Sequence, residues 1–100
     1  MKKFLNFTRE SCGPCGQVKK YFKSINDSRV DVIEDIYLPD FFNESNEPIP
    51  EENLALAEKY GVTVTPVLII ADENGELLET YTGGMPITQN IRKLWTKYHD

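Results

Sequence analysis

The sequence predicts a single α/β domain, residues 1–100, built on a four-stranded mixed sheet with helices on both faces. Three observations support this prediction. A strand, an amphipathic helix and a second strand follow one another in the first 36 residues, which is the pattern of a β-α-β unit with parallel strands. A fully apolar run, residues 67–71, precedes the hairpin signal Asn74-Gly75. A last amphipathic segment completes the order β-α-β, α, β-β-α.

The first β-α-β unit is read from the spacing of its apolar residues. Residues 3–8 are rich in aromatic and aliphatic side chains and predict a short strand. From Pro14 onward a helical stripe follows, formed by Val18, Tyr21, Phe22 and Ile25. Proline suits the first turn of a helix, and the cluster Asn26-Asp27-Ser28 should end this one. Residues 30–36 then predict a strand parallel to the first.

The middle of the chain alternates between a loop and a second helix. Residues 37–50 contain three prolines and predict an extended loop, in which we expect Phe41 and Phe42 to pack on the core. Residues 51–60 predict a helix, because Glu51 and Glu52 suit the positive end of its dipole. Gly61 is placed to end that helix at its C-terminus.

The last third predicts a hairpin followed by a helix. Residues 67–71 are apolar on both faces and should lie in the centre of the sheet, and residues 76–82 should return antiparallel. We expect Thr88 to cap the last helix. The apolar stripe of that helix is Ile91, Leu94, Trp95 and Tyr98.

Composition and charge exclude some classes of partner. The net charge is −5, although residues 1–23 carry six basic side chains against one acidic. The acidic balance and the lack of a basic stripe interleaved with aromatics argue against nucleic-acid binding. The longest apolar run is too short to span a membrane, and no long apolar segment follows Lys2 and Lys3, as a signal peptide would require. We therefore expect a cytoplasmic monomer.

Both cysteines of the chain, Cys12 and Cys15, lie in one Cys-Gly-Pro-Cys sequence. A close pair in a cytoplasmic protein indicates a catalytic dithiol or a metal site rather than a structural disulfide. Zinc usually takes four ligands, and His99 is the one histidine of the chain. A single chain therefore has too few such ligands, which leaves a cluster shared between two copies as the metal alternative.

Three features together resemble the thioredoxin family. Cys12-Gly13-Pro14-Cys15 follows the first predicted strand and begins a helix, as the active-site motif of that family does. Thr65-Pro66 stands where the family has a cis-proline, and Gly83-Gly84 matches its glycine turn after the hairpin. The resemblance covers nearly the whole chain and implies a thioredoxin fold. It also implies a dithiol–disulfide oxidoreductase that reduces protein disulfides, with roles in electron transport and cell redox homeostasis.

The resemblance and the chemistry of thiols suggest a role for each site residue. A thiol at a helix N-terminus has a lowered pKa, so Cys12 is the expected nucleophile and the more buried Cys15 the resolving thiol. Gly13 and Pro14 hold the two sulfur atoms in reach of each other. The residues expected to bind substrate are Ser11, Thr65, Pro66, Gly83 and Gly84.

The expected partners are disulfide-containing proteins and an electron donor, which is either a thioredoxin reductase or glutathione. We expect no cofactor beyond the Cys12–Cys15 disulfide and no metal. Two alternatives remain open. The chain is similar to glutaredoxins in beginning almost at the active-site strand, so a glutathione-dependent reductase is one alternative. A non-catalytic docking subunit with the same fold is the other.

Two positions depart from the family pattern. Ser11 stands where thioredoxins usually have tryptophan, and Asn6 replaces the buried aspartate that manages the proton of the second cysteine. An amide cannot act as a base. The sequence leaves Glu10 and Glu34 as substitutes for the missing carboxylate, and it does not place either of them.

Overall fold

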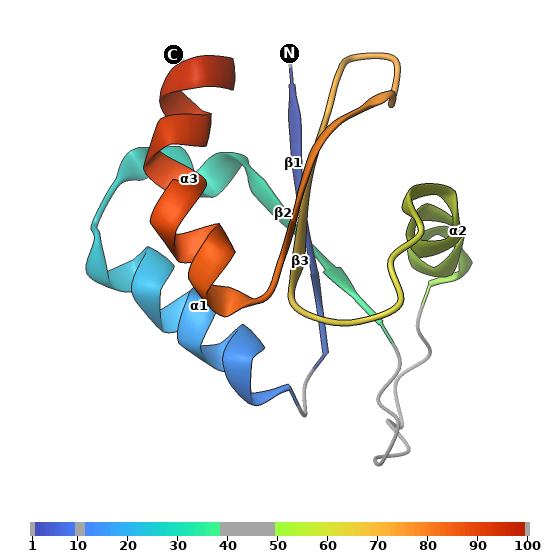
Figure 1. Cartoon of the computed structure of the whole chain (residues 1–100), viewed down its shortest axis with the longest axis horizontal. Helices are drawn as coiled ribbons and strands as arrows, with labels where there is room; N and C mark the ends of the chain where they lie inside the picture. The colour runs from blue at the N-terminus through green and yellow to red at the C-terminus, as the bar shows by residue number, and fades with distance from the viewer. Residues whose placement is uncertain (1, 10–11, 39–49, 100) are drawn as a thin grey trace.

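The computed structural model describes residues 2–9, 12–38 and 50–99 (Figure 1). Their elements are, in chain order, β1 (Lys3–Thr8), α1 (Gly13–Ser24), the 3₁₀ helix η1 (Ser28–Val32), β2 (Ile33–Tyr37), α2 (Glu51–Tyr60), β3 (Val67–Ala71), β4 (Leu77–Thr82) and α3 (Gly84–Tyr98). The predicted mixture and order of strands and helices are confirmed. The interpretation of Phe41 and Phe42 as core residues falls outside the described residues.

The four strands form one mixed sheet in the order β2-β1-β3-β4. β1 pairs with β2 in parallel, as the β-α-β pattern predicts, and β1 pairs with β3 antiparallel. β3 and β4 form the predicted hairpin. Asp72 supports its turn, because the Oδ1 of that side chain accepts hydrogen bonds from the backbone N–H groups of Asn74 and Glu76. Gly75 takes a φ of 83°, a conformation that favours glycine.

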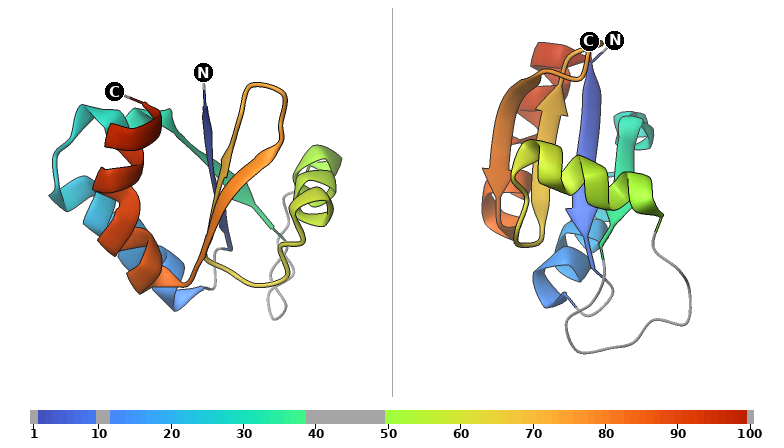
Figure 2. Two further views of the ribbon diagram at one scale, coloured as in Figure 1. Left: turned by 45° about the horizontal axis from the view of Figure 1, so that its top comes forward. Right: turned by 90° about the vertical axis from the view of Figure 1, so that its right-hand side faces the viewer.

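The helices lie in two unequal layers. α1 and α3 pack side by side on one face of the sheet and α2 covers the other (Figures 1 and 2). Because successive strand residues point to opposite faces, β1 contributes Phe4 to the layer of α1 and α3. That core consists of Phe4, Val18, Phe22, Leu68, Ile70, Ile87, Ile91, Leu94 and Trp95.

The second layer is thinner. Its core on the α2 side consists of Leu5, Phe7, Ile36, Leu38, Ala57, Val67, Ile69 and Ala71. α2 buries only the small side chain of Ala57 fully, and 44% of Leu54 stays exposed. Gly61 ends this helix in the left-handed conformation, as predicted.

Two local predictions are wrong. The strand predicted over residues 30–36 begins only at Ile33, and residues 30–32 belong to η1. The carboxylate of Asp27 starts η1, because it accepts from the backbone N–H of Arg29 at 2.9 Å and also binds its guanidinium. This local hydrogen bonding outweighs the preference of the β-branched residues in this segment for a strand. Thr88 does not cap α3, since the helix begins a turn earlier, after Gly83. The hydroxyl of Thr88 instead donates to the backbone oxygen of Met85.

Candidate redox site

The two cysteines lie where β1 gives way to α1. Cys12 is the N-cap residue of α1, and its sulfur accepts a hydrogen bond from the backbone N–H of Cys15 at 3.2 Å. The two side chains are joined as a disulfide, with their Cα atoms 5.2 Å apart. One helical turn therefore holds both sulfur atoms together.

The two cysteines differ in accessibility. Cys15 is 2% exposed, whereas Cys12 is partly exposed. Once the disulfide is reduced, the sulfur of Cys12 faces the unpaired N–H groups and the positive end of the α1 dipole. No acidic residue lies in the first turn of α1 to oppose this effect. The geometry favours a thiolate at Cys12 that a second thiol can reach from inside.

The Thr65–Pro66 segment is tied to the glycine turn. Its peptide bond is cis, as predicted, and Pro66 is fully buried. The backbone N–H of Gly83 donates to the carbonyl oxygen of Pro66 at 2.9 Å. The backbone of Thr65 forms no hydrogen bond with another backbone group of the described residues. This places an open main-chain segment beside the glycine turn.

Gly84 brings the start of α3 against the cysteine motif. A Cβ atom at Gly84 would lie 3.6 Å from the Cγ2 of Val18 and 3.7 Å from the carbonyl oxygen of Pro14. The structure thus gathers Cys12–Cys15, Thr65–Pro66 and Gly83–Gly84 at one end of the molecule. Ser11 lies outside the described residues.

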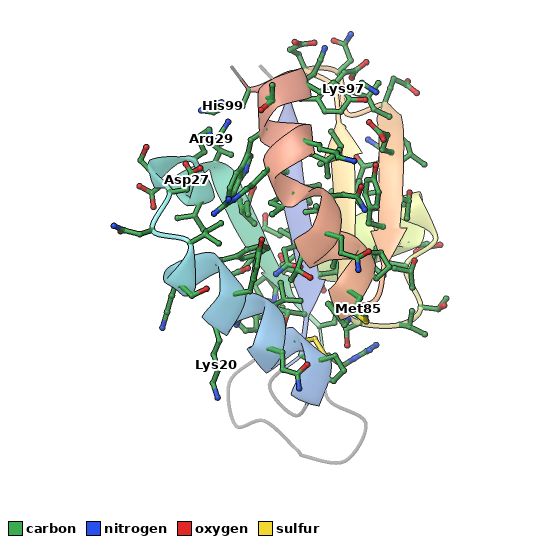
Figure 3. The ribbon with its side chains drawn as sticks, turned by 60° about the vertical axis from the view of Figure 1, so that its left-hand side comes forward. Lys20, Asp27, Arg29, Met85, Lys97 and His99 are labelled. Carbon is green, nitrogen blue, oxygen red and sulfur yellow. A yellow bond between two sulfur atoms is a disulfide. The ribbon has the colours of Figure 1, made fainter. Side chains whose placement is uncertain are left out.

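Two residues of this region were not predicted from the sequence. Met85 is 69% exposed and lies at the start of α3, at the same end of the molecule as the disulfide (Figure 3). The Nη1 of Arg9 donates to the hydroxyl of Thr65 at 3.3 Å, which links the loop before the cysteines to the residue before Pro66. Neither belongs to a recognised pattern. The position of Met85 directly after two glycines is the one signal that the sequence offers for either residue.

Asn6 has a carboxylate neighbour, although neither of the two that the sequence suggested. Asn6 is 1% exposed, and its Nδ2 donates to the Oδ1 of Asp35 at 3.1 Å across the β1–β2 pair. Glu34 instead pairs in register with Leu5, whose side chain lies in the core on the α2 side. Glu10 lies outside the described residues. The carboxylate beside Asn6 is therefore that of Asp35.

Asn6 lies on the side of β1 that α1 covers. It shares this side with Phe4 and Thr8, because these residues alternate with Leu5 and Phe7. The Oδ1 of Asn6 and the Oγ1 of Thr8 are buried, and neither has a hydrogen-bond partner among the residues that the structure describes. Two acceptor atoms thus remain available beneath the helix that carries Cys15.

Comparison with known proteins decides the family. Residues 1–96 match the family model described as a thioredoxin-like domain. The chain belongs to this thioredoxin-like family. No curated protein sequence matches the chain.

Solved structures share the thioredoxin fold of this chain. The exposed lipoprotein thioredoxin of Streptococcus pneumoniae is 21% identical, with a TM-score of 0.70 over 96% of this chain and 84% of that one. Thioredoxin f of spinach chloroplasts is 20% identical, with a TM-score of 0.66 over 99% and 77%. Thioredoxin of Schistosoma mansoni is 23% identical, with a TM-score of 0.65 over 97% and 78%.

The family and the closely spaced cysteine pair together support a thiol–disulfide oxidoreductase in general terms. Among the residues that the structure describes, no three His, Cys, Asp or Glu side chains gather as they would to hold a metal ion. Within the same residues, no helix is both long enough and apolar enough to cross a membrane.

Proposed function

We propose that the protein reduces disulfide bonds in other proteins by transferring two electrons from the Cys12/Cys15 dithiol. The observation that carries this proposal is the unequal burial of a disulfide at the N-terminus of α1. The accessible Cys12 can meet a partner's disulfide, while the buried Cys15 can meet only Cys12. This geometry suits a nucleophile and a resolving thiol.

The reaction proceeds in two exchanges. The thiolate of Cys12 attacks one sulfur of the substrate disulfide, so that a mixed disulfide forms and the other substrate sulfur leaves as a thiolate. The thiolate of Cys15 then attacks the sulfur of Cys12. This step closes the Cys12–Cys15 disulfide and releases the second substrate thiolate. The dithiol loses two electrons, the substrate gains them, and the protons that leave the two cysteines balance those that the substrate thiolates take up.

Substrate binding is proposed for the segments around the cysteines. An extended substrate segment can pair with the main chain of Thr65, which no other backbone group of the described residues occupies. The residues we assign to this surface are Ser11, Thr65, Pro66, Gly83 and Gly84. The exposed side chain of Met85 adds an apolar contact beside them.

Trapping the mixed disulfide tests the mechanism. The Cys15→Ser variant should stop after the first exchange and remain covalently linked to a substrate such as reducible insulin, which mass spectrometry detects. The Cys12→Ser variant is the matched control and should form no adduct. If Cys12→Ser forms the adduct and Cys15→Ser does not, the assignment of roles is wrong. If neither variant forms one and the native protein reduces no disulfide, the proposed function fails.

The electron donor is a separate question. The reducing direction supposes a compartment that keeps thiols reduced, such as the cytoplasm. The oxidised protein is incubated in parallel with a thioredoxin reductase plus NADPH and with glutathione, and the free thiols are counted. Because the chain belongs to the thioredoxin-like family, we propose that a thioredoxin reductase is the electron donor. Reduction by glutathione alone would instead support the glutaredoxin-like alternative.

A further inference from the structure

The two helices on the cysteine side of the sheet carry charge of one sign. Neither α1 nor α3 contains an acidic residue. Together they carry six basic side chains, Lys19, Lys20, Lys23, Arg92, Lys93 and Lys97. The other residues of the chain hold five basic and sixteen acidic side chains. The two helices thus carry a charge of +6 in a chain whose net charge is −5.

Four of these six cations are exposed and form no salt bridge with a carboxylate of the described part of the chain, although the pKa of Asp27 is lowered by hydrogen bonds from Arg29 and, less strongly, by the charge of Arg92. We call Lys20, Lys23, Arg92 and Lys93 the basic face. The other two cations are already engaged. Lys97 pairs with Glu79 at 3.2 Å, and Lys19 donates to the hydroxyl of Tyr37. Asp27, which follows α1, is paired with Arg29 at 2.9 Å.

The opposite layer carries the opposite sign. α2 contains Glu51, Glu52 and Glu58 against the single base Lys59. The β3–β4 turn is also acidic, since it contains Asp72, Glu73 and Glu76. The hydroxyl of Tyr60, at the end of α2, donates to the backbone oxygen of Gly75 in that turn. α2 lies across the sheet from α1 and α3 (Figure 1), so the acidic helix and the two basic helices are on opposite sides of the sheet. Asp35 and Glu79 are carboxylates on the side of α1 and α3, where they contact Asn6 and Lys97.

The basic face is close to the cysteines. Lys20 lies eight residues after Cys12, which is about 12 Å along a helix axis, and in Figure 3 it lies at the same end of the molecule as Met85. That axial separation is comparable to the screening length of about 10 Å at 0.1 M salt and well within the length of about 30 Å at 0.01 M. A partner that reaches Cys12 therefore enters the field of these cations.

We propose that the basic face is a docking surface for disulfide substrates whose disulfide is flanked by acidic residues. The proposal rests on the proposed function, because the docked segment delivers its disulfide to Cys12. Unpaired cations of one sign attract an acidic segment and repel a basic one, and such complementarity acts mainly on the rate of association. Acidic substrates should thus react faster than basic ones of the same redox potential.

Three synthetic peptides test this directly. Each carries the same intramolecular disulfide, flanked by glutamates, serines or lysines, and each oxidises the chemically reduced protein under second-order conditions. At low ionic strength we expect the glutamate peptide to react about tenfold faster than the lysine peptide. At about 0.5 M salt that ratio should approach one, because the charges are screened.

Two variants with the same change of charge locate the effect. Lys20→Glu, on the basic face, should lower the glutamate-to-lysine ratio about threefold. Lys59→Glu, on α2, should leave the ratio as it is. A merely structural defect would slow all three peptides together and would not change the ratio.

The outcomes separate this proposal from the one on which it rests. If the serine peptide is reduced but all three peptides react at one rate, the basic face does not select substrates and only this inference fails. If no peptide is reduced, the proposed function fails first. A glutamate peptide without cysteines should compete with the substrate. If a DNA oligonucleotide competes and that peptide does not, the face binds nucleic acid and the proposal is wrong.

Discussion

Replacing Asn6 by aspartate places a carboxylate where the protein now has a neutral amide. The site is 1% exposed, and its present hydrogen bond is donated by the Nδ2 of Asn6 to the Oδ1 of Asp35 at 3.1 Å. The Asn6→Asp variant loses that donor and sets two carboxylates against each other. Burial and the like charge both disfavour ionisation, so the pKa of the new carboxyl group should rise.

The size of the effect follows from the burial. A rise of about 3 units above the unfolded pKa of about 3.9 is at the low end for a fully buried carboxyl. At about 1.36 kcal/mol per unit, the folded state loses about 4 kcal/mol above the raised pKa. At pH 5 the same shift costs only about 1.5 kcal/mol. Stability is therefore retained in acid and lost as the pH rises through the folded pKa.

Urea unfolding of the native and Asn6→Asp proteins at pH 5 and pH 8 measures this difference. The double variant Asn6→Asp/Asp35→Asn is the control, because an amide at position 35 can donate to the new carboxylate. It should recover part of the stability at pH 8. If Asn6→Asp loses equal stability at both pH values, burial of charge is not the cause.

The same Asn6→Asp variant tests the proton chemistry of Cys15. The new carboxylate would lie on the side of β1 covered by α1, the helix that carries Cys15, and we predict that it accepts the proton of that thiol. The pH profile of disulfide reduction should therefore change in Asn6→Asp. An unchanged profile would show that the residue at position 6 has no part in the proton transfer.

Two further predictions concern the sheet edge and the glycine turn. Hydrogen bonds from the hydroxyls of Tyr81 and Tyr98 hold the pKa of Glu79 below its ordinary value, so its contribution is present at neutral pH and lost as the pH falls through that lowered pKa. Glu79→Gln should cost about 1 kcal/mol at pH 7 and less at pH 3 in urea unfolding, and an equal cost at both would contradict this. Gly83→Ala should cost about 1–3 kcal/mol, because Gly83 has a φ of 97° and a ψ of 159°, a conformation essentially restricted to glycine. Gly84→Ala, whose new Cβ meets only ordinary contacts, should stay within about 0.5 kcal/mol, and equal thermal shifts for the two would refute the strain argument.

The sequence was most informative where the signal is local. A Cys-Gly-Pro-Cys segment between a strand and a helix placed the disulfide at the start of α1. A fully apolar run followed by Asn74-Gly75 indicated a central strand and its hairpin. Each of these patterns depends on residues that are close together in the sequence, so the structure that it predicts does not require knowledge of long-range contacts.

The remaining features depend on contacts between distant residues. The pairing of Asn6 with Asp35 requires the register of β1 against β2, which the apolar pattern does not specify to one residue. A shift of one residue would have turned Glu34 toward Asn6 instead. The basic face likewise exists because α1 and α3 lie on the same side of the sheet, which only the three-dimensional arrangement reveals.

The thin α2 layer has a consequence for how the molecule opens. α2 fully buries only Ala57, whereas the opposite layer buries Trp95 and several large aliphatic side chains. Local unfolding requires least free energy where least apolar surface is buried. Opening of α2 would uncover Leu5, Phe7 and Ile69 while the core behind Cys15 stays closed. We therefore expect amide protons of α2 to exchange with solvent long before those of the buried turns of α1.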